Sequence, residues 1–254
     1  MSTTRREFFT KATEYILLTG AATTAWEYLL AGNAEASPNY KTTEHWWAMI
    51  IDIEKCIGCG NCVRACSEEN NVPEGYFRTW VERYYIPDDW DAQAETPQVD
   101  SPDGAIHGFD DVKRDKPGKS FFVPKLCNHC ADSPCVQVCP VGATFVSPDG
   151  VVLVDETYCI GCRYCVQGCP YGCRFISPTT QTAQKCTLCY HRITKGLTTA
   201  CCEACPTAAR QLGDLKNPKD PIHEFLRTHS VQVLKPHMAT GAKVFYNGLD
   251  ESVR

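Results

Sequence analysis

Cysteine is the residue type that most constrains what this chain can fold into. The chain has 254 residues and 18 cysteines, far more than the packing of a hydrophobic core requires. Only disulfide bonds, zinc sites and iron–sulfur clusters commonly need so many cysteines. Sixteen of them fall into four groups of four within about 150 residues, which makes the pattern a repeat. The spacing within each group decides between the three chemistries.

The four groups share one spacing with small variations. The first is Cys56, Cys59, Cys62 and Cys66; the second is Cys127, Cys130, Cys135 and Cys139; the third is Cys159, Cys162, Cys165 and Cys169; the fourth is Cys186, Cys189, Cys201 and Cys205. Groups one and three have the spacing C-x2-C-x2-C-x3-C of bacterial ferredoxins. Group two widens one gap to four residues, and group four carries an eleven-residue insertion. A proline follows the last cysteine of groups two, three and four.

This spacing suits a cubane cluster. Three cysteines at two-residue gaps can wrap a tight loop around one face of the cube. Small residues such as Gly58, Gly60 and Gly161 let the loop bend and bring backbone N–H groups toward the sulfurs. The fourth cysteine follows after a three-residue gap, at the start of a helix leading away, so it reaches a neighbouring cluster, as in two-cluster ferredoxins. The groups therefore predict four [4Fe–4S] clusters.

Zinc and disulfide bonds explain the groups less well. Zinc sites use four ligands, usually as two C-x2-C pairs, and do not account for a third cysteine at the next two-residue gap. Disulfide bonds suit an exported chain, but cysteines two residues apart rarely bond each other and the repeat would be unexplained. Iron–sulfur chemistry is therefore the interpretation that the residues favour.

The first 36 residues are interpreted as a signal peptide. Residues 4–9, Thr-Arg-Arg-Glu-Phe-Phe, resemble the twin-arginine export motif. A moderately apolar run at 15–31 and the sequence Ala-Glu-Ala at 34–36 follow, which suits a signal peptidase. The expected location is the periplasm or the outer face of the cytoplasmic membrane, with membrane association through a partner. The twin-arginine route fits clusters that are loaded before export, since it carries folded proteins.

Two other interpretations of this segment stay open. In the first, the segment is an ordinary amphipathic helix that contains a pair of arginines by chance. The acidic residues Glu14 and Glu27 favour this interpretation. Alternatively, it is retained as a membrane anchor. No other stretch approaches the roughly 20 apolar residues that a membrane span requires.

Charge and motifs exclude several classes of function. The formal net charge is −5, and cysteine thiolates would make it more negative, so no nucleic-acid partner is expected. There is no Ser-His-Asp arrangement, no phosphate loop and no dinucleotide fingerprint, so the chain by itself is expected to be no enzyme. The lysines beside cysteines (Lys55, Lys125 and Lys185) are read as solvated, with a tuning of cluster potentials as the alternative. His129 and His191 are expected to be structural or to face solvent.

The residues around the cysteines resemble a known family. The sequence is similar to the four-cluster ferredoxin-like electron-transfer subunit of membrane-associated molybdopterin oxidoreductases, such as dimethyl sulfoxide, polysulfide and tetrathionate reductases. The similarity covers residues 47–215. It is carried by Cys-Ile-Gly-Cys-Gly-Asn-Cys at 56–62, Glu-Asn-Asn-Val-Pro at 69–73, Phe-Arg-Thr-Trp-Val-Glu at 77–82, Pro-Lys-Leu-Cys-Asn-His-Cys at 124–130, Cys-Ile-Gly-Cys-Arg-Tyr-Cys at 159–165, Lys-Cys-Thr-Leu-Cys at 185–189 and Glu-Ala-Cys-Pro-Thr at 203–207.

The resemblance implies an α+β fold of two nested dicluster ferredoxin-like modules. An inner module, residues 118–176, holds groups two and three. It is inserted between the halves of an outer module, residues 46–84 and 177–215, which hold groups one and four. A surface insertion occupies residues 85–117, and an extended C-terminal tail occupies 216–254.

The resemblance also implies which cysteines share a cluster. The four ligand sets are Cys56/Cys59/Cys62/Cys205, Cys66/Cys186/Cys189/Cys201, Cys127/Cys130/Cys135/Cys169 and Cys139/Cys159/Cys162/Cys165. Two cysteines, Cys173 and Cys202, remain outside these sets and are expected to be buried free thiols. Cys202 stays open as a competitor of Cys201, although the gaps within group four favour Cys201.

The partners that the resemblance implies are a molybdopterin-containing catalytic subunit and an integral membrane subunit that interacts with quinone. The expected function is the relay of single electrons between them. Two alternatives stay open, a relay between quinol and a multihaem cytochrome without molybdenum, and a free-standing polyferredoxin.

Strands are expected at a few places outside the groups. The segment 85–120 is rich in Asp, Pro and Gly and is long for a structureless loop, so it packs on a partner or carries short strands. The apolar run at 151–155 predicts a short strand before group three. Residues 231–235 and 243–246 are expected to form two further strands or an extended arm.

Overall fold

A computed structural model describes residues 36–91, 96–111 and 116–253. The chain divides into two compact units, Met1–Pro38 and Asn39–Arg254, and the second holds all the cysteines. The expected signal peptide lies almost entirely outside the described residues. Within the second unit, short helices and small sheets are mixed, as expected for an α+β fold. None of the helices among the described residues has the length and apolar character needed to cross a bilayer.

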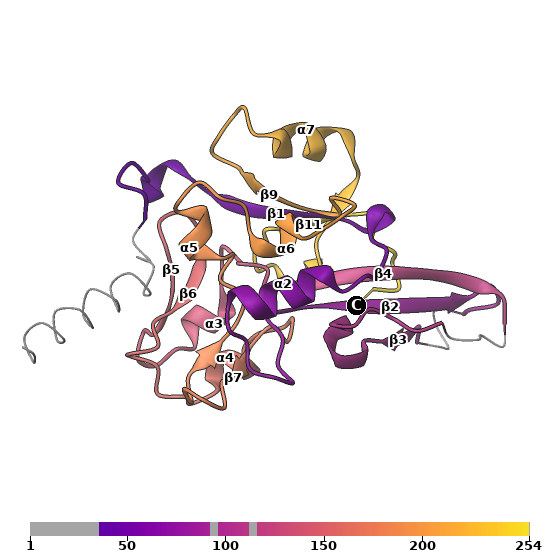
Figure 1. The fold of residues 1–254 in the computed structure, drawn as a ribbon, viewed down its shortest axis with the longest axis horizontal. Coiled ribbons are helices and arrows are strands. Elements are labelled where there is room, and N and C mark those ends of the chain that lie inside the picture. The colour runs from indigo at the N-terminus through magenta and orange to yellow at the C-terminus, as the bar shows by residue number, and fades with distance from the viewer. Residues whose placement is uncertain (1–35, 92–95, 112–115, 254) are drawn as a thin grey trace, which may run out of the picture. The chain divides into compact units, whose positions relative to one another are not determined.

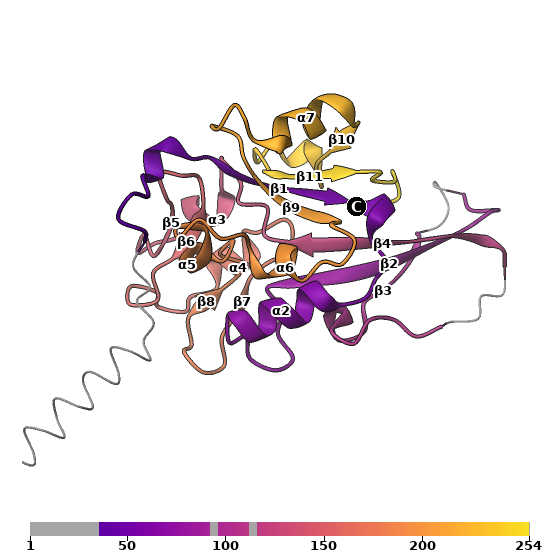
Figure 2. The same cartoon turned by 45° about the horizontal axis from the view of Figure 1, so that its top comes forward.

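The larger sheet joins the two ends of this unit. Its strand order is β10-β11-β1-β9. The strand β1 (Trp47–Asp52) pairs in parallel with β11 (Val244–Asn247) and antiparallel with β9 (Arg210–Asp214). The short strand β10 (Val231–Gln232) pairs antiparallel with β11. Residues far apart in sequence therefore form one sheet (Figures 1 and 2).

The central strand β1 is apolar because both of its faces are covered. Met49 and Ile51 point into the main core, which also contains Tyr246 of β11. Ala48 and Ile50 point to the opposite face and pack with Ile222 of the helix α7 (Pro221–Thr228). The helix α7 lies over this face of the sheet in both views (Figures 1 and 2).

Local sequence explains where α7 begins and how closely it packs. Asp220 is its N-cap and accepts a hydrogen bond from the backbone N of Ile222 at 2.9 Å, and Pro221 occupies the first turn. Gly213 of β9 lies directly beneath the helix. A Cβ atom at this position would lie 2.5 Å from Cδ1 of Ile222, so the close approach of α7 requires glycine.

A second sheet has the order β3-β2-β4. The strands β2 (Thr79–Pro87) and β4 (Gly118–Leu126) form a long antiparallel ribbon, and β3 (Gln98–Asp100) pairs with β2. A 3-10 turn, η3 (Pro102–Ala105), follows β3. The segment 85–120 thus carries short strands, which confirms one of its two interpretations. The strand β4 opens the range expected for the inner module, yet its partner β2 lies in the outer module (Figure 1).

The cysteines lie on or beside short helices. The helices are α2 (Asn61–Glu69), α3 (Pro134–Gln137), α4 (Tyr164–Gln167), α5 (Tyr190–Ile193) and α6 (Ala200–Glu203). Two small hairpins join them, β5 (Thr144–Val146) with β6 (Val152–Val154), and β7 (Phe175–Ile176) with β8 (Ala183–Gln184). Single 3-10 turns are η1 (Thr42–Glu44), η2 (Ile53–Lys55) and η4 (Pro236–Met238).

The strands expected from local sequence are present, but the tail differs from an extended arm. The run at 151–155 forms β6, and the segments 231–235 and 243–246 contain β10 and β11. Together with α7, these tail strands complete the larger sheet. The reason is burial: Tyr246 is fully buried in the main core, and its hydroxyl donates to the carbonyl of Pro124 at 3.1 Å. The tail is part of the fold.

Candidate iron–sulfur sites

Site 1 is a hollow of about 320 Å³ lined by one expected ligand set, Cys56, Cys59, Cys62 and Cys205. The first three come from the loop before α2 and from its first turn, and the fourth follows α6. Burial raises the pKa of Cys56 to about 11. The insertion helps to enclose this loop, because the Arg64 guanidinium donates to the carbonyl of Ile106.

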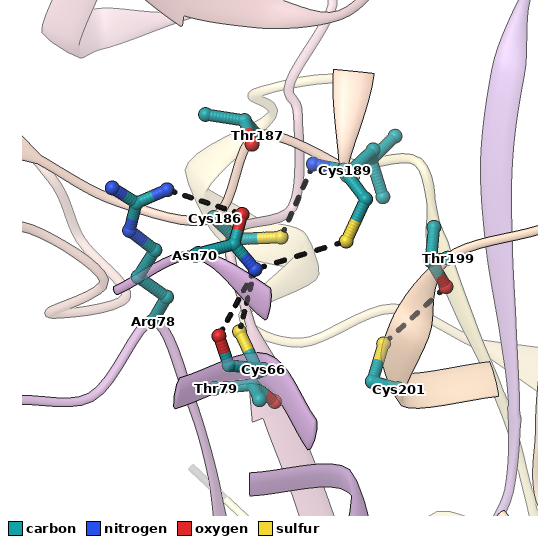
Figure 3. Close-up of a pocket in the computed structure, with 10 residues that line it drawn as sticks. Cys66, Asn70, Arg78, Thr79, Cys186, Thr187, Cys189, Thr199 and Cys201 are labelled. Carbon is teal, nitrogen blue, oxygen red and sulfur yellow. Dashed lines mark hydrogen bonds between the residues drawn. The ribbon is translucent and has the colours of Figure 1, made fainter. Parts of the chain in front are cut away.

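Site 2 is a hollow of about 280 Å³ lined by Cys66, Cys186, Cys189 and Cys201. Their sulfurs point toward a common space (Figure 3). Asn70 lies at its edge, where Nδ2 donates to the sulfurs of Cys66 and Cys189 at 3.6 and 3.8 Å. Because α2 carries Cys62 and Cys66 on one turn, this helix contributes to sites 1 and 2.

Site 3 gathers Cys127, Cys130, Cys135 and Cys169. The pKa of Cys130 is raised to about 11, first by burial and also by the sulfurs of the other three, which are its close electrostatic neighbours. The guanidinium of Arg174 lies against this site, with Nη2 donating to the sulfur of Cys135 at 3.1 Å.

Site 4 is a hollow of about 300 Å³ lined by Cys139, Cys159, Cys162 and Cys165. Cys162 is exposed to solvent, whereas Cys165 is buried. The backbone N of Ala183 donates to the sulfur of Cys159 at 3.3 Å. Each of the four sites thus brings together the four cysteines of one expected ligand set. That these cysteines bind a cluster stays a prediction.

The thiols surround hollows and do not converge on one point. Within the described ranges, no three His, Cys, Asp or Glu side chains lie close enough to hold a single metal ion.

The loops at the four sites share one backbone feature. The residue two positions after the first cysteine of every group has a positive φ: Gly58 at 69°, His129 at 43°, Gly161 at 68° and Leu188 at 51°. In this conformation the backbone N of His129 points to the sulfur of Cys127 at 3.5 Å, and that of Leu188 to Cys186 at 3.4 Å. The glycines predicted this turn in groups one and three. In groups two and four the same turn forms at a residue other than glycine, so the surrounding structure must hold the backbone in this conformation.

The sites follow one another in a row. Cys62 of site 1 and Cys201 of site 2 are electrostatic neighbours, as are Cys186 of site 2 and Cys127 of site 3. Sites 3 and 4 meet through Cys135 and Cys165, which pack in one cluster of buried residues. The order along the row is therefore 1, 2, 3, 4.

The two remaining cysteines lie beside candidate ligands. Cys173 is buried, and its thiol and backbone N–H donate to Cys169 and lower the pKa of that residue to about 5. The Cys202 thiol does the same to Cys201 and lowers its pKa to about 5. Cys202 also contacts the sulfur of Met49 at 3.6 Å and is not among the residues lining site 2.

Two family models match the chain. Both are described as 4Fe–4S dicluster domains, one over residues 55–143 and the other over residues 119–215. A subunit of the tetrathionate reductase of Salmonella typhimurium is 44% identical over 210 residues, which cover 82% of this chain and 74% of the relative. The arsenate respiratory reductase iron–sulfur subunit of a Shewanella species is 31% identical over 246 residues, which cover 78% of this chain and 94% of the relative. The chain belongs to the ferredoxin-like iron–sulfur subunits of molybdopterin oxidoreductases.

A third relative of this iron–sulfur subunit extends the comparison to quinol oxidation. The Hdr-like menaquinol oxidoreductase iron–sulfur subunit 1 of Archaeoglobus fulgidus is 34% identical over 282 residues, which cover 92% of this chain and 96% of the relative. Members of this family are electron-transfer subunits, and so is this chain.

The donors in the iron–sulfur subunit fit [4Fe–4S] clusters. Each site offers four thiols, one for each iron. Several buried nitrogens of residues near the grouped cysteines also lack a hydrogen-bond partner among the residues that the structure describes. They are Nδ2 of Asn128, Nε2 of His129, Nε of Arg174, and Nε and Nη2 of Arg210. Buried N–H groups require acceptors, and the inorganic and cysteine sulfurs of a cluster supply them.

The lysines and histidines near cysteines differ from one another. The expectation of a solvated side chain is wrong for two of the three lysines. Lys185 is 1% exposed and donates to the carbonyl of Cys186 at 2.7 Å. Lys125 is also buried and pairs with Glu82 at 2.6 Å. It holds for Lys55, which is half exposed. His129 is structural as expected, because its Nδ1 accepts from the backbone N of Val152 at 3.1 Å.

Sequence reasoning did not find Asn70, Arg174 and Arg210, which all lie against cysteine sulfurs. None of them belongs to the spacing pattern. A signal for the two arginines is available in the repeat, since both stand five positions after the last cysteine of their group.

Proposed function

We propose that this iron–sulfur subunit relays single electrons through four [4Fe–4S] clusters, one at each site, between a quinone-linked membrane subunit and a catalytic molybdopterin subunit. The observation that carries the proposal is the gathering of sixteen thiols into four sets of four in a row. A row of centres suits stepwise transfer across a protein. When bound, a cluster supplies a one-electron carrier held by thiolates.

The residues of this chain have distinct roles in the proposal. The sixteen cysteines hold the clusters as thiolates. Backbone N–H groups such as those of His129 and Leu188 donate to thiolate sulfurs and so favour added negative charge. The core around Met49, Ile51 and Tyr246 excludes water from the middle of the row.

Iron analysis tests the number of clusters. We expect about 16 iron and 16 sulfide per chain in an anaerobic preparation, since each [4Fe–4S] cluster has four of each. A value near 8, or zinc in stoichiometric amounts, contradicts the proposal of four clusters.

The partners form the second part of the proposal. Relatives that bear the names of tetrathionate and arsenate reductases support a catalytic partner, and the menaquinol oxidoreductase relative supports a quinol-linked one. Purification of the native complex followed by identification of its subunits and metals tests this part. A stable complex with a multihaem cytochrome and no molybdenum would favour the alternative relay.

Export by the twin-arginine route is the third part. The supporting observation is the arginine pair Arg5 and Arg6, followed by an apolar run. With both arginines changed to lysine, we expect the chain to accumulate in the cytoplasm with its iron content unchanged. Delivery of the double variant across the membrane at the normal rate would falsify this targeting.

A further inference from the structure

Cysteine groups three and four are each followed by an arginine that cluster ligation does not require. Arg174 follows Cys169 in Cys-Pro-Tyr-Gly-Cys-Arg, and Arg210 follows Cys205 in Cys-Pro-Thr-Ala-Ala-Arg. Arg210 opens β9, and Arg174 directly precedes β7. Both side chains are buried, with Arg174 5% and Arg210 2% exposed. A buried cation thus occupies the same position of the repeat twice.

Arg210 lies between sites 1 and 2. It lines the hollow of site 1 together with Cys56, Cys59, Cys62 and Cys205. Its Nη1 donates to Oγ1 of Thr79 at 2.8 Å, and Thr79 lines the hollow of site 2. Its charge interacts with Cys62 of site 1 and with Cys201 of site 2. The guanidinium therefore acts on both sites.

Arg174 occupies the corresponding place between sites 3 and 4. Its Nη2 donates to the sulfur of Cys135 in site 3 at 3.1 Å. Its Nη1 lies 3.3 Å from Oγ1 of Thr144, which lines the hollow of site 4. Its charge also interacts with Cys127 of site 3 and Cys165 of site 4. Both arginines are therefore held by a threonine that borders the second site of their pair.

Thiolates are the anions that compensate these two charges. Among the residues that the structure describes, neither guanidinium forms an ion pair with a carboxylate. Burial lowers the pKa of each guanidinium, but the surrounding cysteines more than offset this and leave both pKa values raised. A guanidinium stays protonated in proteins, so each arginine is a permanent positive charge that faces sulfur on two sides.

We propose that Arg210 and Arg174 set the reduction potentials of the clusters in pairs, each raising the potentials of both clusters that flank it. Reduction adds one electron to a cluster and so one negative charge. A fixed cation in a buried, weakly screened position stabilises that charge. Because one guanidinium faces two sites, it shifts both potentials in the same direction. This proposal rests on the proposed function, since it requires a cluster at each site.

Neutral and charge-conserving variants of both arginines test the proposal on the full chain. The variants are Arg210→Gln, Arg210→Lys, Arg174→Gln and Arg174→Lys, and the readout is the midpoint potential of every cluster in redox-titrated EPR. We expect each glutamine variant to lower the potentials of both clusters beside it. The expected size is at least a tenfold loss in the one-electron reduction equilibrium, which corresponds to about 59 mV. The two clusters of the other module keep their potentials, and the lysine variants keep all four.

Arg83 supplies a matched control. It is also buried, but it pairs with Asp100 through Nε at 2.9 Å and lies in β2, opposite β3. We expect Arg83→Gln to leave all four potentials unchanged. A shift in this variant as large as in the others overturns the proposal, because loss of any buried arginine would then suffice.

Other outcomes are equally decisive. Unchanged potentials in the glutamine variants overturn the proposal. A shift confined to the cluster at site 3 in Arg174→Gln also overturns it, because the residue then acts only as a hydrogen-bond donor to Cys135. If a glutamine variant fails to load iron, the lysine variant decides: retained potentials at both flanking clusters support the proposal, and a tenfold shift at either one overturns it. Failure of the proposed function shows separately, as a wild-type iron content far below 16 per chain.

Discussion

At the scale of single residues, the adjacent pair Cys201 and Cys202 separates ligand from neighbour. Cys201 lines site 2, whereas Cys202 packs against Met49 and donates to Cys201. Cys173 likewise donates to Cys169, and its sulfur lies 3.1 Å from the carbonyl oxygen of Leu126. We expect Cys202→Ala and Cys173→Ala to keep the full iron content and to lose about 1 kcal/mol of stability, the usual net value of one hydrogen bond.

The matched control for this prediction is Cys201→Ala. We expect this variant to lose one cluster, which iron analysis and EPR of the purified chain detect. Loss of a cluster in Cys202→Ala, with Cys201→Ala intact, would show that Cys202 is the ligand.

The spacing pattern picked out the sixteen cysteines that gather at the four sites, whose binding of clusters stays a prediction, but it did not reveal their surroundings, for a physical reason. The spacing of ligands along the chain is set by the reach of a loop around a cube, so it is visible in sequence. Burial depends on distant segments. Lys55 and Lys185 both directly precede the first cysteine of a group, yet one is half exposed and the other is fully buried. The contacts of Asn70, Arg174 and Arg210 with cysteine sulfurs depend on the fold in the same way.

At the scale of elements, the insertion and the helix α2 fit together at one glycine. Gly60 is the N-cap of α2, with φ of 73°. A Cβ atom here would lie 2.1 Å from the carbonyl oxygen of Ala105 at the end of η3. We expect Gly60→Ala to lower stability by more than about 2 kcal/mol, from backbone strain together with this contact, and to make the cluster at site 1 labile. Thermal unfolding and iron content measure the two effects.

Gly75 separates the two causes. It also has a positive φ, 77°, but a Cβ atom there would meet nothing within 4 Å. We expect Gly75→Ala to show only the conformational cost, about 1 kcal/mol, and to keep its iron. Equal losses in the two variants would mean that contact with η3 contributes nothing.

A second link between elements joins α2 to α5 beside site 2. Glu69 at the end of α2 accepts from Nε2 of His191 at 2.6 Å and from Nη1 of Arg192 at 2.8 Å. The hydrogen bond from His191 is the largest cause of its lowered pKa. The stabilisation is therefore present above the ordinary carboxyl range and is lost as the pH falls through the lowered pKa.

We expect Glu69→Gln to lose about 1 kcal/mol at neutral pH, as for a partly buried ion-pair network, with a lower melting temperature of the loaded protein. Glu68→Gln is the control, since it removes the same charge from the exposed side of the helix. If both variants melt at the same temperature, the link between α2 and α5 carries no stability.

The presence of strands was predictable from the sequence, but their pairing partners were not. The alternating or continuous apolar runs at 151–155, 231–235 and 243–246 predicted strands, and each forms one. Their partners were not visible, because pairing such as that of Met49 with Val244 joins residues almost 200 positions apart. The same limit explains why the tail was expected to be extended.

At the scale of the whole molecule, the order of the sites depends on cysteines that leave one site and enter the next. Cys135 in α3 lies at site 3, while Cys139, just beyond the same helix, lines site 4. Cys165 in α4 lines site 4, and Cys169 returns to site 3. Four helical residues advance the chain by about 6 Å, enough to carry the next cysteine from one cluster toward its neighbour.

This crossing makes the two sites mutually dependent, since neither group of cysteines completes a cluster alone. A local assignment would instead give Cys139 to the site of Cys135, its nearer neighbour in sequence. We predict that Cys139→Ser and Cys165→Ala perturb the same spectroscopic cluster, while Cys135→Ala perturbs a different one. Redox-titrated EPR of the three variants distinguishes the two assignments, because each cluster titrates at its own potential. If Cys139→Ser alters the same signal as Cys135→Ala, the ligands are local, and the nested arrangement of two ferredoxin modules is wrong.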